Sequence, residues 1–299
     1  MDKLSSATLT IAIPTYNRPE KLFEQVKSLL AQIVDDVQIV VLDNACTTPV
    51  ELLFSQKDLE IVKIYRNPFN IGADANIARC FFLCQSPWLW VLSDDDTISS
   101  NAIKDVLDVI NNKPEALYLN FNHEGDKECC DIDSFIEVGR KSYSDLFWMS
   151  ICVYNVARLK PYFYDYFSST STMQPGVLMV LSAMQNEPSG VVAFDHHQII
   201  CKGGKEISWN RERFVYSSLF VINLILMRIP RVPLVFLSSI SEMCFEAVVM
   251  QYDSNRDIIR ALRLTNAISK SLSFSLFWRY GCWQAMKCYM RLAKHYLIR

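Results

Sequence analysis

Short apolar segments alternate with helix-like segments along the first third of the chain, and this alternation limits the possible folds more than any other feature. Strands are predicted at residues 9–13, 38–42, 61–65 and 88–92, and helical spacing of apolar residues at 22–30, 73–84 and 101–111. Such alternation is typical of βα units arranged around a mostly parallel sheet. The predicted fold class is therefore α/β, with a mostly parallel sheet flanked by helices.

Several start signals mark the first of these helices. Asn17 is the predicted N-cap, Pro19 lies in the first turn, and Glu20 follows three residues after the cap. We expect the helix to begin at this point.

The second half of the chain is less regular. Strands are predicted at 116–121, 148–153 and 191–194, and a helix at 177–184. The segment 124–140 carries many charges and is expected to leave the core. The segment 161–175 is rich in Tyr, Phe, Ser and Thr and is expected to form a loop wall.

The C-terminal region differs in charge from the rest of the 299-residue chain. Residues 254–299 carry nine Lys or Arg and one Asp, a net charge of +8, so the preceding residues carry −10 of the total of −2. Over 276–298 the basic residues alternate with Trp and Tyr, a pattern of helices that lie on anionic lipid headgroups. A solvated helix packed on the main domain is the alternative. No nucleic-acid partner is expected, because the basic residues lie in an apolar helical tail.

An apolar segment precedes this tail at residues 214–240. Its longest nearly uncharged stretch, 214–229, has sixteen residues, which is short of the roughly 20 that a spanning helix needs. A buried or membrane-surface helical hairpin is expected, with a transmembrane helix as the alternative. The ten cysteines are scattered without a CxxC pair, and no secretory signal precedes them, so reduced thiols in the cytoplasm are expected.

Polar residues follow the carboxyl ends of the predicted strands in the first half. Asp43 follows the second strand, Asn67 the third, and Ser93 with three aspartates the fourth. In open α/β sheets these strand ends meet at the edge that binds ligands. Three adjacent carboxylates, Asp94 to Asp96, repel one another unless a cation neutralises them, and such oxygen ligands suit Mn²⁺ or Mg²⁺. A solvated acidic loop is the alternative.

Four motifs, in order along the chain, carry a resemblance to a known family. They are Ile11-Ala12-Ile13-Pro14-Thr15-Tyr16-Asn17-Arg18, then Val41-Leu42-Asp43-Asn44, then Asn67-Pro68-Phe69-Asn70-Ile71-Gly72 with Asn76 and Arg79, and Ser93-Asp94-Asp95-Asp96. Over residues 8–110 they resemble the family 2 glycosyltransferases of the GT-A fold, whose Rossmann-like sheet binds a nucleotide sugar. The resemblance fades after residue 121. It implies a catalytic domain at 1–211 and a helical, membrane-associating region at 212–299.

The resemblance assigns roles to individual positions. The implied nucleotide-sugar contacts are Pro14, Thr15, Tyr16, Asn17, Arg18, Asp43, Asn44, Asn70, Gly72, Asn76, Arg79, Asp94 and Asp95. Asp43 would accept a hydrogen bond from a pyrimidine ring or otherwise fix the base, whereas Asn76 and Arg79 would face the diphosphate side. The triplet corresponds to the family's DxD element, which implies Asp94 and Asp96 as ligands of Mn²⁺ or Mg²⁺.

The family pattern is incomplete at two points. Ser93 stands where the DxD element often begins with Asp, and no carboxylate stands near residue 175, where a catalytic base is expected at the start of a helix. An inverting transfer needs such a base. The candidate bases, in order of preference, are Asp165, Glu187 and Asp195. His196 and His197 could supply a metal ligand or a base, with a purely structural role as the alternative.

The predicted function is transfer of a hexosyl or deoxyhexosyl group from a nucleoside-diphosphate sugar to a lipid-linked or cell-surface glycan, such as lipopolysaccharide O-antigen. The enzyme is expected to be peripheral on the cytoplasmic face of the membrane. A non-catalytic, membrane-associated assembly protein is the alternative, because the base is not evident. The sequence lacks the GxxxxGK[ST] loop of P-loop kinases, the GxGxxG turn of dinucleotide-binding enzymes and the Gly-rich, Arg-containing loop of nucleotidyltransferases.

Overall fold

The computed structural model describes residues 7–141, 143–146, 148–172, 175–187 and 190–202. The predicted helical region 212–299 and its boundary at residue 211 lie outside these described residues. Within them, no helix is long and apolar enough to cross a membrane. The seven cysteines that the structure describes are all free.

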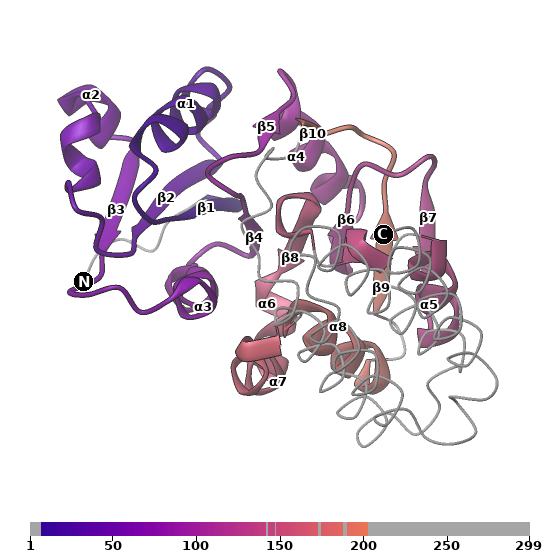
Figure 1. The fold of residues 1–299 in the computed structure, drawn as a ribbon. Coiled ribbons are helices and arrows are strands. Elements are labelled where there is room, and N and C mark those ends of the chain that lie inside the picture. The colour runs from indigo at the N-terminus through magenta and orange to yellow at the C-terminus, as the bar shows by residue number, and fades with distance from the viewer. Residues whose placement is uncertain (1–6, 142, 147, 173–174, 188–189, 203–299) are drawn as a thin grey trace, which may run out of the picture.

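An eight-stranded mixed sheet forms the centre of the described chain, in the order β3-β2-β1-β4-β8-β6-β9-β7 (Figure 1). Its strands are β1 (Leu9–Thr15), β2 (Val37–Asp43), β3 (Val62–Arg66), β4 (Trp88–Val91), β6 (Ala116–Asn120), β7 (Lys127–Cys129), β8 (Cys152–Asn155) and β9 (Val191–Phe194). Strands β1 to β4 are parallel, β8 is antiparallel to β4 and β6, β9 is parallel to β6, and β7 is antiparallel to β9. All strands except β7 and β8 therefore run in one direction, which confirms the predicted mostly parallel sheet. A separate two-stranded sheet pairs β5 (Thr97–Ile98) with β10 (Ile200–Lys202).

The strand order reverses at β1, and this reversal positions the site. The chain moves outward from β1 through β2 to β3 and then returns to place β4 on the other side of β1. Helices α1 (Pro19–Leu30) and α3 (Ala73–Leu83) therefore lie on opposite faces of the sheet (Figure 1). A crevice at the carboxyl ends of β1 and β4 is the expected ligand site of such a sheet.

The remaining helices connect the strands along the chain. They are α2 (Gln56–Leu59), α4 (Ala102–Asn112), α5 (Ile132–Lys141), α6 (Val156–Leu159), α7 (Phe163–Ser168) and α8 (Pro175–Asn186). The four predicted helices are found as α1, α3, α4 and α8, with bounds that differ by a few residues.

The strands that carry the site are buried. Leu9, Ile11 and Ile13 of β1 have no exposed surface. Trp90 of β4 is equally buried, and its indole N–H donates to the backbone oxygen of Ser150 at 2.7 Å. The Ser150 hydroxyl accepts the backbone N–H that follows β4, at residue 93, at 3.0 Å. The start of the acidic loop is thus fixed to the segment that leads into β8.

The predicted N-cap at Asn17 is wrong. Helix α1 begins at Pro19, with Arg18 as its N-cap. Asn17 has a φ of 53°, and its side-chain oxygen accepts the backbone N–H of Thr47 at 2.7 Å. Its own N–H donates to the sulfur of Cys46 at 3.1 Å. The Asn17 side chain therefore joins the loops after β1 and β2 instead of capping the helix.

The segment 124–140 does not leave the core as predicted. Strand β7 pairs with β9, and α5 packs behind it. Phe135 of α5 is 1% exposed, and its ring centroid lies 6.0 Å from that of Phe194. Lys127, Glu128, Asp133 and Glu137 are exposed on these short elements, whereas Cys129 and Phe135 face inward. The many charges therefore belong to elements of the fold and do not mark a segment outside it.

The aromatic segment 161–175 contains helical turns where a loop was predicted. Helix α7 places the Tyr166 ring 4.1 Å from Phe81 of α3, measured between centroids. Burial of these rings stabilises the helical turns. The strand predicted at 148–153 begins only at Cys152, because Met149–Ile151 form a 3-10 turn.

Candidate active site

The loop after β1 meets the acidic triplet after β4. The hydroxyl of Thr15 donates to Asp94 at 2.7 Å. The guanidinium of Arg18 lies 2.9 Å from an oxygen of Asp94 and 3.2 Å from one of Asp95, and the Lys21 ammonium lies 3.8 Å from the same Asp95 oxygen. Because β1 and β4 are adjacent parallel strands, these contacts form at the reversal point of the sheet.

Two of the three carboxylates are buried, with exposed fractions of 4% for Asp94 and 6% for Asp96. Burial raises the pKa of Asp94, although the hydrogen bonds from Thr15 and Arg18 oppose this shift. The chain therefore holds a carboxylate in a place where its negative charge is unfavourable without a cation.

Side-chain donors orient the other two carboxylates. The Ser93 hydroxyl donates to Asp95 at 2.5 Å, and the indole N–H of Trp148 donates to Asp96 at 3.1 Å. Within the described part of the chain, the cationic partners of these carboxylates are Arg18 and Lys21. All ligand atoms of the triplet are oxygens, and this donor set fits Mg²⁺ or Mn²⁺.

Asp43 is fully buried at the end of β2, with an exposed fraction of 0%. One of its oxygens accepts the backbone N–H of Cys46 at 2.7 Å, and the other pairs with the guanidinium of Arg66. Arg66 also donates to the backbone oxygen of Cys46 at 2.7 Å. Asp43 thus fixes the shape of the loop after β2. The predicted contact between its carboxylate and a nucleotide base would require this loop to open.

Four asparagines form one hydrogen-bond network beside this loop. The Asn67 amide donates to Asn44 at 2.8 Å and to Asn76 at 2.9 Å, and Asn44 donates to Asn70 at 2.8 Å. Asn76 in turn donates to the backbone oxygen of Leu42 at 2.9 Å. Asn76 is 2% exposed and its amide supports the turn. Its contact with the diphosphate stays a prediction.

The remaining predicted contacts lie on the rim of this region. Tyr16 is 45% exposed in the loop after β1. Arg79 is half-buried on α3, three residues after Asn76. Neither position conflicts with its predicted role.

Gly72 occupies a backbone conformation that favours glycine. Its φ is +86° and its ψ is 159°, and it is the N-cap of α3. Its N–H donates to the side-chain oxygen of Asn70 at 2.8 Å, which links the turn to the asparagine network. A Cβ at this position would have no atom within 4 Å, so a larger residue is disfavoured here only by the backbone conformation.

We expect Gly72→Ala to lower the free energy of unfolding by about 1–2 kcal/mol, because alanine disfavours this φ and ψ combination. Nucleotide affinity should fall as well, since the turn would shift. Thermal unfolding and calorimetric titration measure the two effects. Gly125→Ala is the matched control, because Gly125 also has open space around it but no positive φ. Equal stability of the two variants would contradict the prediction.

Glu187 lies at the wrong edge of the sheet for a catalytic base. It precedes β9, so it lies with the amino ends of the parallel strands, opposite the triplet. Its carboxylate lies 2.7 Å from the guanidinium of Arg158, which is also 3.6 Å from the carboxylate of Glu115. Glu187 is therefore a structural ion-pair partner.

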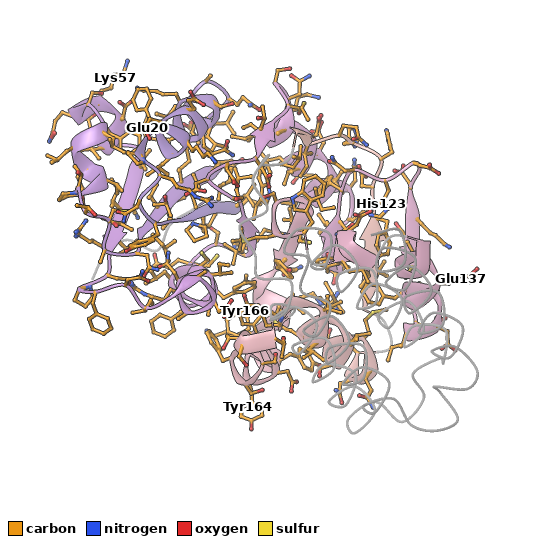
Figure 2. All side chains as sticks on the ribbon, in the orientation of Figure 1. Glu20, Lys57, His123, Glu137, Tyr164 and Tyr166 are labelled. Atoms are coloured by element: carbon orange, nitrogen blue, oxygen red, sulfur yellow. The ribbon has the colours of Figure 1, made fainter. Side chains whose placement is uncertain are left out.

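Asp165 is also remote from the triplet. It lies on α7 between Tyr164, which is 74% exposed, and Tyr166, which packs on Phe81 (Figure 2). Phe81 belongs to the last turn of α3, whose first turn begins at the carboxyl edge of the sheet. The contact therefore places α7 toward the opposite edge.

Asp195 follows β9 and lies at the same edge as the triplet. Two strands, β8 and β6, separate β9 from β4, which corresponds to about 14 Å at a strand spacing of about 4.8 Å. The carboxylate is 3% exposed and is bound by His197. A general base must lie within hydrogen-bond reach of the proton that it removes, and none of the three predicted carboxylates lies beside the triplet.

Sequence reasoning missed several residues that shape the site. The position of Arg66 could have indicated its contact with Asp43, because the two residues end the adjacent strands β3 and β2 in register. The position of Trp148 gave no such indication, because it lies 52 residues beyond Asp96 and outside every motif.

The chain matches a known family over the part that carries the site. The family Glycosyl transferase family 2 matches residues 10–128, which include β1 to β4 and the triplet. Abequosyltransferase RfbV from Salmonella typhimurium is 30% identical over 100 residues. That match spans 32% of this chain and 30% of the length of the relative.

Solved structures share the fold. S. aureus TarS 1-349 superimposes with a TM-score of 0.64 at 11% identity, over 98% of this chain and 92% of that chain. Its complex with UDP-GlcNAc gives a TM-score of 0.63, also at 11% identity and with the same shares covered. The mannosyltransferase PcManGT from Pyrobaculum calidifontis, in complex with GDP-Man and Mn²⁺, gives 0.53 at 12% identity, over 96% of this chain and 87% of that chain. The matched motifs, the sheet order and these likenesses agree: residues 10–128 are similar to Glycosyl transferase family 2, and the chain shares the fold of these solved structures, as expected for the GT-A fold.

Proposed function

We propose that this chain transfers a sugar from a nucleoside-diphosphate sugar to a lipid-linked or cell-surface glycan, with inversion and with a divalent cation. The observation that carries the proposal is the meeting of the loop after β1 with the triplet. Thr15 and Arg18 both contact Asp94 there, at 2.7 Å and 2.9 Å. A nucleotide bound at this edge would have its diphosphate next to both the basic and the acidic side chains.

The asparagine network and the loops after β1 and β2 would hold the nucleotide. The Thr47 N–H donates to Asn17 at 2.7 Å and joins these two loops, which would together form one side of the nucleotide site. Solved structures with the same fold hold UDP-GlcNAc, UDP or GDP-Man, which supports a nucleoside diphosphate as the donor's leaving group.

Asp94 and Asp96 would hold Mn²⁺ or Mg²⁺, with Asp95 between the cation and the ribose. A bound divalent cation stabilises the negative charge that develops on the departing diphosphate. The chain's own contribution is orientation: Thr15 fixes Asp94, and Trp148 fixes Asp96. Arg18 neutralises the triplet until the ligand arrives and would then face the diphosphate.

The acceptor and the cellular location are part of the proposal. The relative named an abequosyltransferase supports a deoxyhexose as the transferred sugar and an O-antigen unit as the product. The basic, aromatic tail supports a peripheral position on an anionic membrane. Proton NMR of the product would give the anomeric configuration, and retention would contradict the inverting mechanism.

The proposal is tested by calorimetric titration of the full chain with UDP, GDP, CDP and dTDP, with and without Mn²⁺. Metal-dependent binding of one nucleotide, followed by transfer from its sugar derivatives to a membrane-lipid acceptor, is the expected result. Absence of binding to all four would favour the non-catalytic assembly protein, for which the distance of the three predicted bases from the triplet is the supporting observation.

We expect Arg18→Ala to bind Mn²⁺ about tenfold more tightly in the absence of nucleotide, because the guanidinium competes with the cation for Asp94 and Asp95. Nucleotide affinity should fall, since the diphosphate loses a cationic partner. Arg158→Ala is the matched control, because Arg158 forms its ion pairs at the opposite edge. Unchanged or weaker Mn²⁺ binding in Arg18→Ala would exclude this competition.

A further inference from the structure

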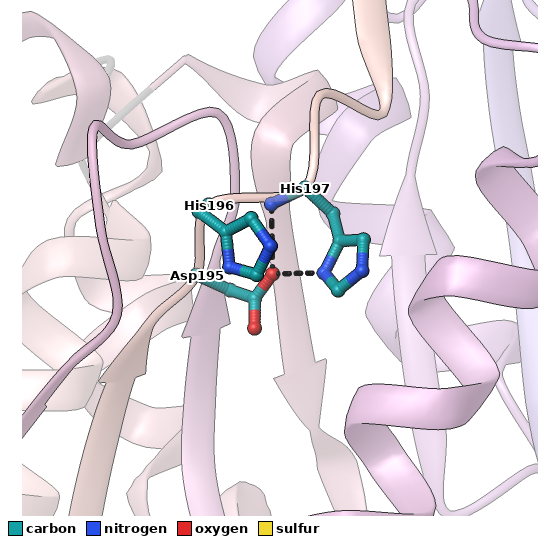
Figure 3. Close-up of side chains that lie close together, drawn as sticks. All are labelled: Asp195, His196 and His197. Atoms are coloured by element: carbon teal, nitrogen blue, oxygen red, sulfur yellow. Dashed lines mark hydrogen bonds and ion pairs between the residues drawn. The ribbon is translucent and has the colours of Figure 1, made fainter.

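Three of the four histidines of the protein gather at the ends of two neighbouring strands. His196 and His197 follow β9, and His123 follows β6. The fourth, His295, lies outside the described residues. Asp195, between β9 and the histidine pair, completes a compact group, with the two imidazole rings beside its carboxylate (Figure 3).

The polar atoms of this group converge. One oxygen of Asp195 accepts the backbone N–H of His197 at 2.9 Å and lies 2.6 Å from its Nδ1. One ligand atom each from Asp195, His196 and His197 lies within 4.8 Å of the others. The two imidazole rings stack, with centroids 4.4 Å apart and planes inclined by 29°.

A further carboxylate, that of Asp126, holds His196. His196 Nδ1 lies 2.6 Å from Asp126, which also accepts the His196 backbone N–H at 3.0 Å. Metal-binding histidines commonly use one ring nitrogen for the cation and the other for such a carboxylate, which fixes the ring and its tautomer. Asp126 therefore occupies the place of an orienting partner, and His196 Nε2 remains for a cation.

We propose that Asp195, His196 and His197 form a second cation site, separate from the triplet and suited to Zn²⁺. Two imidazole nitrogens and one carboxylate oxygen are the ligands that Zn²⁺ takes in sites with three protein ligands and one open position. On binding, the cation would replace the proton shared by Asp195 and His197, and their 2.6 Å contact would widen to about 3.2 Å. The triplet offers only oxygens, so the two sites differ in preferred cation.

The place of the site in the fold suggests what the cation would do. The segment after His197 continues into β10, and β10 pairs with β5 directly after Asp96. The backbone N–H of Ser99 donates to the oxygen of Ile199 at 2.8 Å, which extends this pairing. A cation at the end of β9 would therefore fix the start of the segment that supports the loop after the triplet. It would also fasten this segment to Asp126 in the connection that leads into β7.

The test uses the full chain, freed of metal with a chelator and titrated with Zn²⁺ alone by calorimetry. We expect one tight Zn²⁺ equivalent and a rise in the thermal unfolding midpoint on binding. His196→Asn and His197→Asn keep a nitrogen close to the position of Nδ1, so their hydrogen bonds to Asp126 and Asp195 can persist while the ligand is lost. Each should weaken Zn²⁺ binding by at least about 100-fold, and Asp126→Asn by about 10- to 100-fold.

Two controls separate this site from others. His295→Asn should leave Zn²⁺ affinity unchanged, and Asp96→Asn should lose Mn²⁺-dependent nucleotide binding but keep the Zn²⁺ equivalent. Co²⁺ in place of Zn²⁺ should give the intense visible absorption of four-coordinate Co²⁺, which the His196→Asn/His197→Asn double variant should lack. A double variant that still binds the tight Zn²⁺ equivalent would overturn the proposal, since the cation would then lie elsewhere and the cluster would only fasten the turn.

Discussion

Asp96→Asn is expected to abolish Mn²⁺-dependent nucleotide binding and to lower sugar transfer by at least about 100-fold, while the chain stays folded. Asp96 is 6% exposed, and its carboxylate is oriented by the indole of Trp148 at 3.1 Å. The asparagine keeps an oxygen that accepts this hydrogen bond, so its shape and packing change little. A loss of binding and transfer would therefore show that the cation needs the negative charge of the Asp96 carboxylate.

Asp108→Asn is the matched control for this variant. Asp108 lies on the exposed side of α4 and pairs with Lys104 at 3.0 Å, one helical turn away, where an ion pair contributes little. The control should bind nucleotide and transfer sugar like the parent. If Asp96→Asn kept its metal-dependent binding, the cation would be held without Asp96, and Asp94 would be the next ligand to replace.

The sequence was most informative where neighbours in the fold are fixed by the strand pattern. Strand ends can be read from alternating segments, and parallel strands bring their carboxyl ends to one edge. The strand pattern alone therefore predicts that Asp43, the triplet and the loop after β1 lie at one edge of the sheet. The contact of Thr15 with Asp94 spans 79 residues, yet it follows from two adjacent strands that end side by side.

The supporting contacts could not be predicted in the same way. Trp148 reaches Asp96 from the residue before the 3-10 turn Met149–Ile151, which follows no motif, and its direction depends on how β8 inserts antiparallel between β4 and β6. The residue type and the position of Asn76 along α3 suit either a contact with the ligand or a hydrogen bond that supports the turn. Its burial in the packed structure, which the sequence does not reveal, is what favours the supporting role.

The two predicted bases Asp165 and Glu187 lie away from the triplet for a related reason. Their prediction rests on position along the chain relative to a predicted helix. Glu187 lies beyond the end of α8, at the edge opposite the triplet, and it pairs with Arg158 at 2.7 Å. A position along the chain does not say at which edge of the sheet a side chain lies unless the direction of the intervening helix is known.

The ion pair between Asp43 and Arg66 should respond asymmetrically to mutation. Asp43 has an exposed fraction of 0%, whereas the side chain of Arg66 is 34% exposed. Arg66→Gln leaves a buried carboxylate without its counter-charge and should cost about 3–5 kcal/mol of unfolding free energy. Asp43→Asn leaves an arginine that can turn toward water, so we expect a smaller cost of about 2 kcal/mol. Chemical denaturation of the full chain measures both.

The double variant and nucleotide titration complete this test and separate structure from binding. Asp43→Asn/Arg66→Gln should be less destabilised than the sum of the single variants, with a coupling of about 1–3 kcal/mol, because neither charge is then left alone. If Asp43 only shapes the loop through Cys46, both single variants should lose nucleotide affinity in proportion to their loss of stability. If its carboxylate also binds the base when the loop opens, Asp43→Asn should lose more affinity than Arg66→Gln despite its smaller destabilisation. Equal destabilisation of the two single variants would contradict the proposed asymmetry of burial.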